Sequence, residues 1–166
     1  KQTEEETKKN QSLLQQAEEI SNQGAWEWDI VKDEWTFSKN WLRIHGYQFS
    51  GIKREELMKI ADPEDAPRIE KAFQEALDGG PRYDLEHRIV RQNDGMVRYV
   101  RAVGNFIFND AGKRVKMFGV TQDITDKKQA EEKAEENEVK YGELFGSVGD
   151  AIFIYDPDSF EIIEAN

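Results

Sequence analysis

Hydrophobic and polar side chains alternate at several places along the chain, and this two-residue period predicts β-strands. The alternation begins after Ala25, where Trp26, Trp28 and Ile30 are separated by acidic residues. A tight turn at Lys32-Asp33 then leads to a second short strand over residues 34–37, which gives a hairpin.

The same alternation returns in the second half of the chain and predicts three more strands, at residues 82–92, 96–108 and 114–124. Asn93-Asp94-Gly95 and Asn109-Asp110-Ala111-Gly112 separate them. Because such residues adopt the left-handed conformations of tight hairpin turns, we expect the three strands to be antiparallel neighbours.

Helical signals lie between the two groups of strands. Ser38 can cap a short helix that ends near Gly46, and residues 53–60 form another short helix. A longer helix over 64–78 starts at Asp62-Pro63-Glu64-Asp65. Acids and proline are favoured at a helix start, so we interpret these acids as helix capping rather than a cation site. Glu86 and Arg88 share one strand face, where they could pair with each other or contact a partner.

Each end of this central region carries a segment with helical periodicity. Residues 1–22 form a helix with a thin apolar seam of Leu13, Ala17 and Ile20, which Gly24 breaks. The second segment has a heptad register, a weak coiled coil or a solvated single helix. The a and d positions of that register are Lys127, Ala130, Ala134, Asn137, Tyr141 and Leu144.

The last part of the chain, residues 144–166, repeats the beginning of the central region. Tyr155-Asp156 aligns with Trp28-Asp29, a strand is expected from Ile152 to Asp156, and a second strand follows at Phe160–Ile163. This second unit holds only the first elements of the repeat, so it cannot bury a core by itself.

The order of elements and five short motifs together resemble the PAS domain family. The motifs are Gly24-Ala25-Trp26-Glu27-Trp28-Asp29, Ile60 to Asp65, Leu85 to Ile89, Asp94-Gly95 through Tyr99, and Gly119 to Thr125. The resemblance implies an α+β fold with a five-stranded antiparallel sheet in the order 2-1-5-4-3 and helices over one face. It also implies a PAS domain at 24–126 between linker helices at 1–23 and 127–143, with a truncated second PAS domain at 144–166.

Composition narrows the partners and the location. The net charge is −11 and no segment is basic, so neither nucleic acid nor an anionic membrane surface is expected as a partner. No apolar run approaches the roughly 18 residues of a membrane span. We therefore expect a cytoplasmic location. Because the chain begins with Lys1, we also expect that it is part of a longer protein.

The fold that the family implies encloses a small cavity, which in relatives holds haem, flavin, another small molecule or nothing. The chain has no cysteine, so flavin photochemistry through a cysteinyl bond is excluded. Haem is disfavoured, because His45 and His87 are interpreted as partly exposed structural residues. Non-covalent flavin or a small metabolite stays open, as does plain core packing of the aromatic residues. The pocket candidates are Trp26, Trp28, Phe37, Trp41, Phe73, Phe106 and Phe118.

The functional prediction is a sensory or signal-relay module of a histidine kinase or cyclic-dinucleotide enzyme. Asp123-Ile124-Thr125 joins the last strand to the exit helix, and Thr125 is expected to accept backbone amides of the first helical turn. A shift of the strand would then move the helix, and a homodimer would form through the linker helices and sheet. The alternative is a ligand-free dimerisation or spacer module. The sensory module predicts a cavity of roughly 300 Å³ or more lined by a few polar groups, and the spacer module predicts a filled core. An enzyme is not expected, because the sequence suggests no pairing of a nucleophile with a base.

Overall fold

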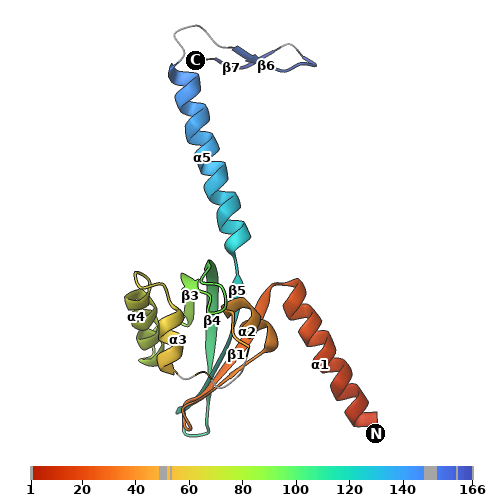
Figure 1. The fold of residues 1–166 in the computed structure, drawn as a ribbon, viewed down its shortest axis with the longest axis vertical. Coiled ribbons are helices and arrows are strands. Elements are labelled where there is room, and N and C mark those ends of the chain that lie inside the picture. Colours follow the sequence, from red (N-terminus) through yellow and green to blue (C-terminus); the bar gives the residue numbers. More distant parts are fainter. Residues whose placement is uncertain (1, 49–51, 53, 148–152, 160, 166) are drawn as a thin grey trace. The chain divides into compact units, whose positions relative to one another are not determined.

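A computed structural model describes residues 2–48, 52, 54–147, 153–159 and 161–165. The chain divides into two compact units, Lys1–Thr125 and Asp126–Asn166. The first unit holds a five-stranded antiparallel sheet in the order β2-β1-β5-β4-β3 (Figure 1). This confirms the predicted α+β class and strand order.

The sheet is built so that the first and last strands lie side by side at its centre. Its strands are β1 (Gln23–Asp29), β2 (Glu34–Phe37), β3 (Tyr83–Val90), β4 (Val97–Phe108) and β5 (Arg114–Asp123). The strand β1 pairs antiparallel with both β2 and β5. Val100 and Met117 are fully buried beneath the helices, because alternate residues of each strand point to the same face.

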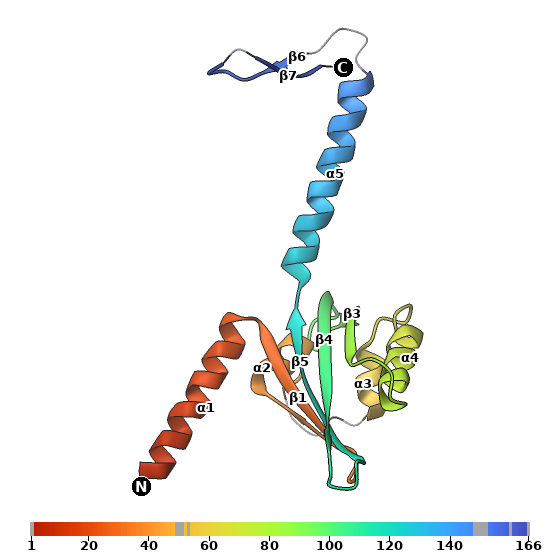
Figure 2. The same ribbon diagram turned by 180° about the vertical axis from the view of Figure 1, so that it is seen from behind.

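Three helices cover one face of this sheet: α2 (Lys39–His45), α3 (Arg54–Ile60) and α4 (Ala66–Leu77), as Figure 1 and the reverse view in Figure 2 show. The predicted caps of α2 are confirmed. The Ser38 Oγ accepts a hydrogen bond from Trp41 N at 3.2 Å, and Gly46 ends the helix at a φ of 77°.

Two glycines opposite each other on neighbouring strands make room for an indole ring. Gly104 on β4 pairs with Gly119 on β5, and the Trp26 ring lies over both. A Cβ atom at Gly104 would lie 2.6 Å from Trp26 Cη2, and one at Gly119 would lie 2.5 Å from Trp26 Cζ2. The flat backbone at these two positions therefore lets Trp26 lie close to the sheet.

The entry helix α1 (Gln2–Ile20) ends earlier than the sequence predicted. The chain turns at Asn22, whose φ is 51°, and Gly24 belongs to β1 rather than breaking the helix. Gly24 is needed for another reason: a Cβ there would lie 2.3 Å from the Trp41 Cα of α2. The apolar seam of α1 is exposed, with Ile20 at 88%.

The acids before α4 do not all act as helix caps. The Asp65 side chain makes no capping bond; its Oδ2 instead accepts from Arg88 N at 2.8 Å and from Arg88 Nε at 3.0 Å. These bonds hold the pKa of Asp65 below its usual range. Arg88 also bonds Glu64 at 2.9 Å. The prediction of capping is thus wrong for Asp65. Arg88 pairs with Asp65 and Glu64 rather than with its strand neighbour Glu86, because the start of α4 lies against β3.

The second unit continues from Thr125, the first residue of α5 (Thr125–Ser147), which runs past the predicted end at residue 143. It also contains a hairpin of β6 (Phe153–Tyr155) and β7 (Ile162–Ala165). The second of these strands starts at Ile162, two residues later than predicted, and Phe160 and Ile152 lie outside the described residues. Among the described helices, none combines the length and apolarity needed to cross a membrane.

Candidate functional site

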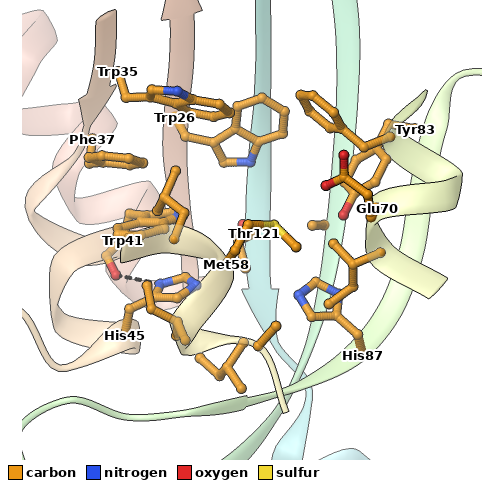
Figure 3. Close-up of a pocket in the computed structure, with 17 residues that line it drawn as sticks. Trp26, Trp35, Phe37, Trp41, His45, Met58, Glu70, Tyr83, His87 and Thr121 are labelled. Atoms are coloured by element: carbon orange, nitrogen blue, oxygen red, sulfur yellow. Dashed lines mark hydrogen bonds between the residues drawn. The ribbon is translucent and has the colours of Figure 1, made fainter. Parts of the chain in front are cut away.

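The three helices and the sheet form a partly open cavity of about 120 Å³ (Figure 3). Its walls are mostly aromatic and aliphatic, with a few polar groups. The lining residues are Trp26, Trp35, Phe37, Trp41, His45, Leu57, Met58, Ile60, Ala61, Ile69, Glu70, Phe73, Tyr83, His87, Ile89, Ala102 and Thr121. This volume lies below the roughly 300 Å³ predicted for a sensory module, and the core is not completely filled either, as a spacer module would require.

One wall of the cavity is a continuous stack of rings that runs from β2 into α2. Trp35 stacks on Phe37 with centroids 6.1 Å apart, and Phe37 stacks on Trp41 at 4.0 Å. The His45 ring then stacks on Trp41 at 3.6 Å, one helical turn further along. Stacked rings of this kind restrict one another, so this wall is a firm, flat surface for a ligand.

Three of the predicted pocket residues besides Trp26 line this cavity, namely Phe37, Trp41 and Phe73. Trp28 is buried but lies behind the lining, where its ring stacks on Trp35 at 5.4 Å and packs against Phe73 at 5.5 Å. Trp28 thus supports the wall without facing the cavity.

The other two pocket candidates lie elsewhere. Phe106 is half-buried against the core, with the Arg114 guanidinium 5.0 Å from its ring centre. Phe118 is 43% exposed, because it follows the buried Met117 on β5 and so points to the opposite face of the sheet. The prediction placed Phe118 on the wrong face; its position in the strand alternation carries the signal that corrects this.

His45 is buried, not partly exposed as predicted, and one of its nitrogens faces the cavity. Its Nδ1 lies 2.9 Å from the Trp41 carbonyl oxygen. Because a carbonyl can only accept, Nδ1 carries the hydrogen and Nε2 keeps a free lone pair in the neutral ring. Burial lowers the pKa of His45 to about 3, so the ring is neutral at physiological pH.

His87 enters the cavity from β3, and its ring and that of His45 both point into it in Figure 3. His87 is partly exposed, as predicted, yet its ring is desolvated enough to lower its pKa to about 4, so this ring is neutral as well. Its Nδ1 is buried and makes no hydrogen bond of good geometry among the residues that the structure describes, while the backbone of Leu85 lies near enough to offset part of the pKa shift. The alternation of β3 could have identified His87, because it shares a face with the buried Tyr83 and Ile89.

The face of α2 that points away from the cavity is polar, and its side chains form hydrogen bonds with the turn where the entry helix α1 ends. Asn40 is buried, and its Nδ2 donates to the carbonyl of Gln23 and to that of Glu18 at 2.9 Å. Arg43 Nε donates to Asn40 Oδ1 at 2.7 Å, and Arg43 Nη2 donates to Asn22 Oδ1 at 2.7 Å. One short helix therefore touches both the cavity and the α1–β1 turn.

The predicted relay residues lie beside this same turn. The Asp123 amide donates to the Asn22 carbonyl at 3.0 Å, and the Ile124 amide donates to the Tyr99 carbonyl at 2.9 Å. Thr125 Oγ1 accepts from Tyr99 N at 3.0 Å rather than from the first turn of the helix. Thr125 therefore bonds to β4 instead of capping α5 as predicted. The amide of Thr125 itself donates a hydrogen bond to Asp123 Oδ1 at 3.0 Å.

Comparison with known proteins shows where this arrangement recurs. The family model for the PAS fold matches residues 34–121. A probable diguanylate cyclase of Escherichia coli, DgcE, is 26% identical over 152 residues, which cover 89% of this chain and 14% of that protein. The hybrid signal transduction histidine kinase I of Dictyostelium discoideum is 30% identical over 122 residues, 71% of this chain and 7% of that protein. The chain thus spans a small part of these relatives.

Solved structures share the same fold. A sensory box histidine kinase/response regulator from Burkholderia thailandensis superposes with a TM-score of 0.63 at 24% identity, covering 76% of this chain and 95% of that chain. A domain of a putative light and redox sensing histidine kinase from Haloarcula marismortui gives a TM-score of 0.55 at 25% identity, covering 69% of this chain and 99% of that chain.

Proposed function

This chain belongs to the PAS-fold family, and from that premise we propose that it is a sensory or signal-relay module of a larger multidomain signalling protein. A histidine kinase or a cyclic-dinucleotide enzyme is the proposed parent, because relatives with these names match most of the chain. The module itself is non-catalytic in this proposal. It detects a small molecule in the cavity and passes the change to the exit helix.

The observation that carries the proposal is the position of α2 between the cavity and the junction of the two linker helices. Trp41 and His45 face the cavity, while Asn40 and Arg43 bind the turn where α1 ends. A ligand that presses on the ring stack changes the position of α2 and therefore the hydrogen bonds on its far side.

From that turn the change reaches the start of α5. Asn22 is paired with Asp123 through the backbone, and Asp123 holds the amide of Thr125, the first residue of the exit helix. A helix that continues from a shifted strand end can pass on a rotation or a register change if two arrangements are close in energy. The sequence Asp123-Ile124-Thr125 is the proposed relay segment.

We further propose that two chains pair through the linker helices and that residues 144–166 begin a second PAS domain. The heptad positions of α5 include Ala130 and Ala134, with polar Lys127 and Asn137 that weaken the seam. A weak seam suits a relay, because neither of two registers is strongly preferred. The hairpin of β6 and β7 supports the second domain, since it repeats that of β1 and β2.

Cross-linking tests this relay directly, because the chain has no native cysteine. Variants Ala130→Cys and Ala134→Cys are oxidised separately, with and without phenol as a one-ring aromatic probe of the cavity. We expect the ratio of the two disulfide yields to change by more than twofold when the probe is bound. An unchanged ratio with a saturated cavity would reject the relay, and the absence of any cross-link would reject the paired helices.

A second candidate is a ligand-free dimerisation or spacer module, and the outer face of the sheet favours it. An open groove there is lined by Phe118, Val120 and Val103, and the first two side chains are 43% and 37% exposed. Substitution of Phe118 by Asp would then abolish the dimer measured by analytical ultracentrifugation, whereas probe binding in the cavity would have no effect on the helices.

A further inference from the structure

The volume of the cavity indicates the size of ligand that it suits. Its volume of about 120 Å³ is close to that of an engineered apolar cavity of about 150 Å³ that binds benzene. The ring stack of Phe37, Trp41 and His45 offers a flat wall to such a molecule. The volume of this conformation therefore suits one aromatic ring with small substituents.

The charges around the cavity indicate which ligand charge it accepts. The residues that line it, all within the described part of the chain, include no lysine or arginine. Its two imidazoles are neutral, so a carboxylate or phosphate would lose its hydration without gaining a counter-charge. Glu70 is the lining residue that carries a negative charge, and because it is exposed to solvent its screened charge is a poor counter-charge for a cation inside the cavity. An anionic ligand is therefore strongly disfavoured.

Among the hydrogen-bonding groups of the cavity, the imidazole of His45 offers an acceptor to a ligand that carries a donor. His45 Nδ1 is committed to the Trp41 carbonyl, which leaves the Nε2 lone pair as an acceptor that faces the cavity in Figure 3. His87 presents a second neutral ring in the lining of the same cavity. A buried acceptor without a partner costs free energy, so a ligand O–H that fills it gains affinity and orientation.

We propose that the cavity binds a small, uncharged, one-ring aromatic molecule that carries a hydroxyl group, of the phenol class, with the hydroxyl donating to His45 Nε2. The ring lies against the aromatic stack, and the hydroxyl oxygen, whose one hydrogen is donated to His45, can also accept a hydrogen bond from the N–H of His87. This inference rests on the proposed sensory function and names the ligand class of the same site.

The test is calorimetric titration of the full chain with four one-ring probes that differ in charge and donor: phenol, toluene, benzoate and benzylammonium. We expect phenol to bind most tightly and the two ions to bind at least tenfold more weakly. Tighter binding of benzoate or benzylammonium would overturn the ligand class while leaving a sensory cavity in place. No binding of any probe would overturn both the ligand class and the cavity-based sensory function.

A matched variant isolates the hydrogen bond from ring packing. His45→Phe keeps a flat ring against Trp41 but removes the acceptor. We expect the ratio of phenol to toluene affinity to fall about fivefold in this variant, which is the size of one ordinary hydrogen bond. An unchanged ratio would refute the assigned bond. The four-probe series on the natural chain decides the ligand class even if this variant fails to fold.

Discussion

Asn40→Ala is the substitution that most directly tests how α2 holds the entry turn. The side chain is 3% exposed and makes three hydrogen bonds: two donated to the carbonyls of Gln23 and Glu18, and one accepted from Arg43 Nε. An intramolecular hydrogen bond contributes about 0.5–1.5 kcal/mol, and buried groups left unpaired add to the loss. We therefore expect the free energy of unfolding to fall by about 2–4 kcal/mol.

Urea denaturation followed by tryptophan fluorescence measures this loss, since Trp26, Trp28 and Trp41 are buried in the fold. The control is Lys39→Ala, an exposed neighbour on the same helix, which we expect to change stability by less than about 0.5 kcal/mol. If Asn40→Ala were as mild as the control, the polar face of α2 would not hold the turn, and the route from the cavity to the relay segment would fail.

Three further substitutions or conditions probe the core and the cavity. Met117→Ala removes a fully buried side chain and should lower the unfolding free energy by about 2–5 kcal/mol in urea titration; a loss below 1 kcal/mol would contradict its place in the core. Gly104→Ala places a Cβ 2.6 Å from the Trp26 ring, so we expect a loss of about 1–3 kcal/mol and a shifted Trp26 emission, and an unaltered spectrum would refute the close contact. In the folded protein the pKa values of His45 and His87 are lowered to about 3 and about 4. Below about pH 6.5 the unfolded chain therefore binds more protons than the folded protein, so the free energy of unfolding decreases as the pH is lowered. We expect the free energy of unfolding, measured by urea denaturation at each pH, to decrease by about 2 kcal/mol between pH 7 and pH 5.5. In His45→Phe we expect about half of this decrease. A free energy of unfolding that does not change over this pH range would contradict neutral rings in the folded protein.

Most of the fold was predictable because its strands have one buried face. Trp26 and Trp28 alternate with polar residues, and Asp94-Gly95 marks a hairpin turn, so local pattern determines these elements. The end of α1 was misplaced, because the reason for Gly24 is its close approach to Trp41 of α2. A contact between elements far apart in sequence leaves no local signal.

The cavity and the junction between β5 and α5 were predicted less completely. Phe37, Trp41 and Phe73 were found as aromatic residues, but His45 and His87 were interpreted as structural, since burial and a lowered pKa depend on tertiary packing. Asp65 was assigned to capping, whereas its carboxylate binds Arg88 across the fold. The role of Thr125 also changed, because its partner is Tyr99 on a neighbouring strand.

The central claim is that an occupied cavity alters the junction at which both linker helices meet the sheet. Amide hydrogen exchange on the full chain measures this, comparing the free protein with protein saturated by phenol. The account predicts that the exchange rates of the Asp123 and Ile124 amides, which donate to Asn22 and Tyr99, change by more than threefold, and that Asn40→Ala abolishes the change. Altered exchange confined to the residues that line the cavity would contradict it.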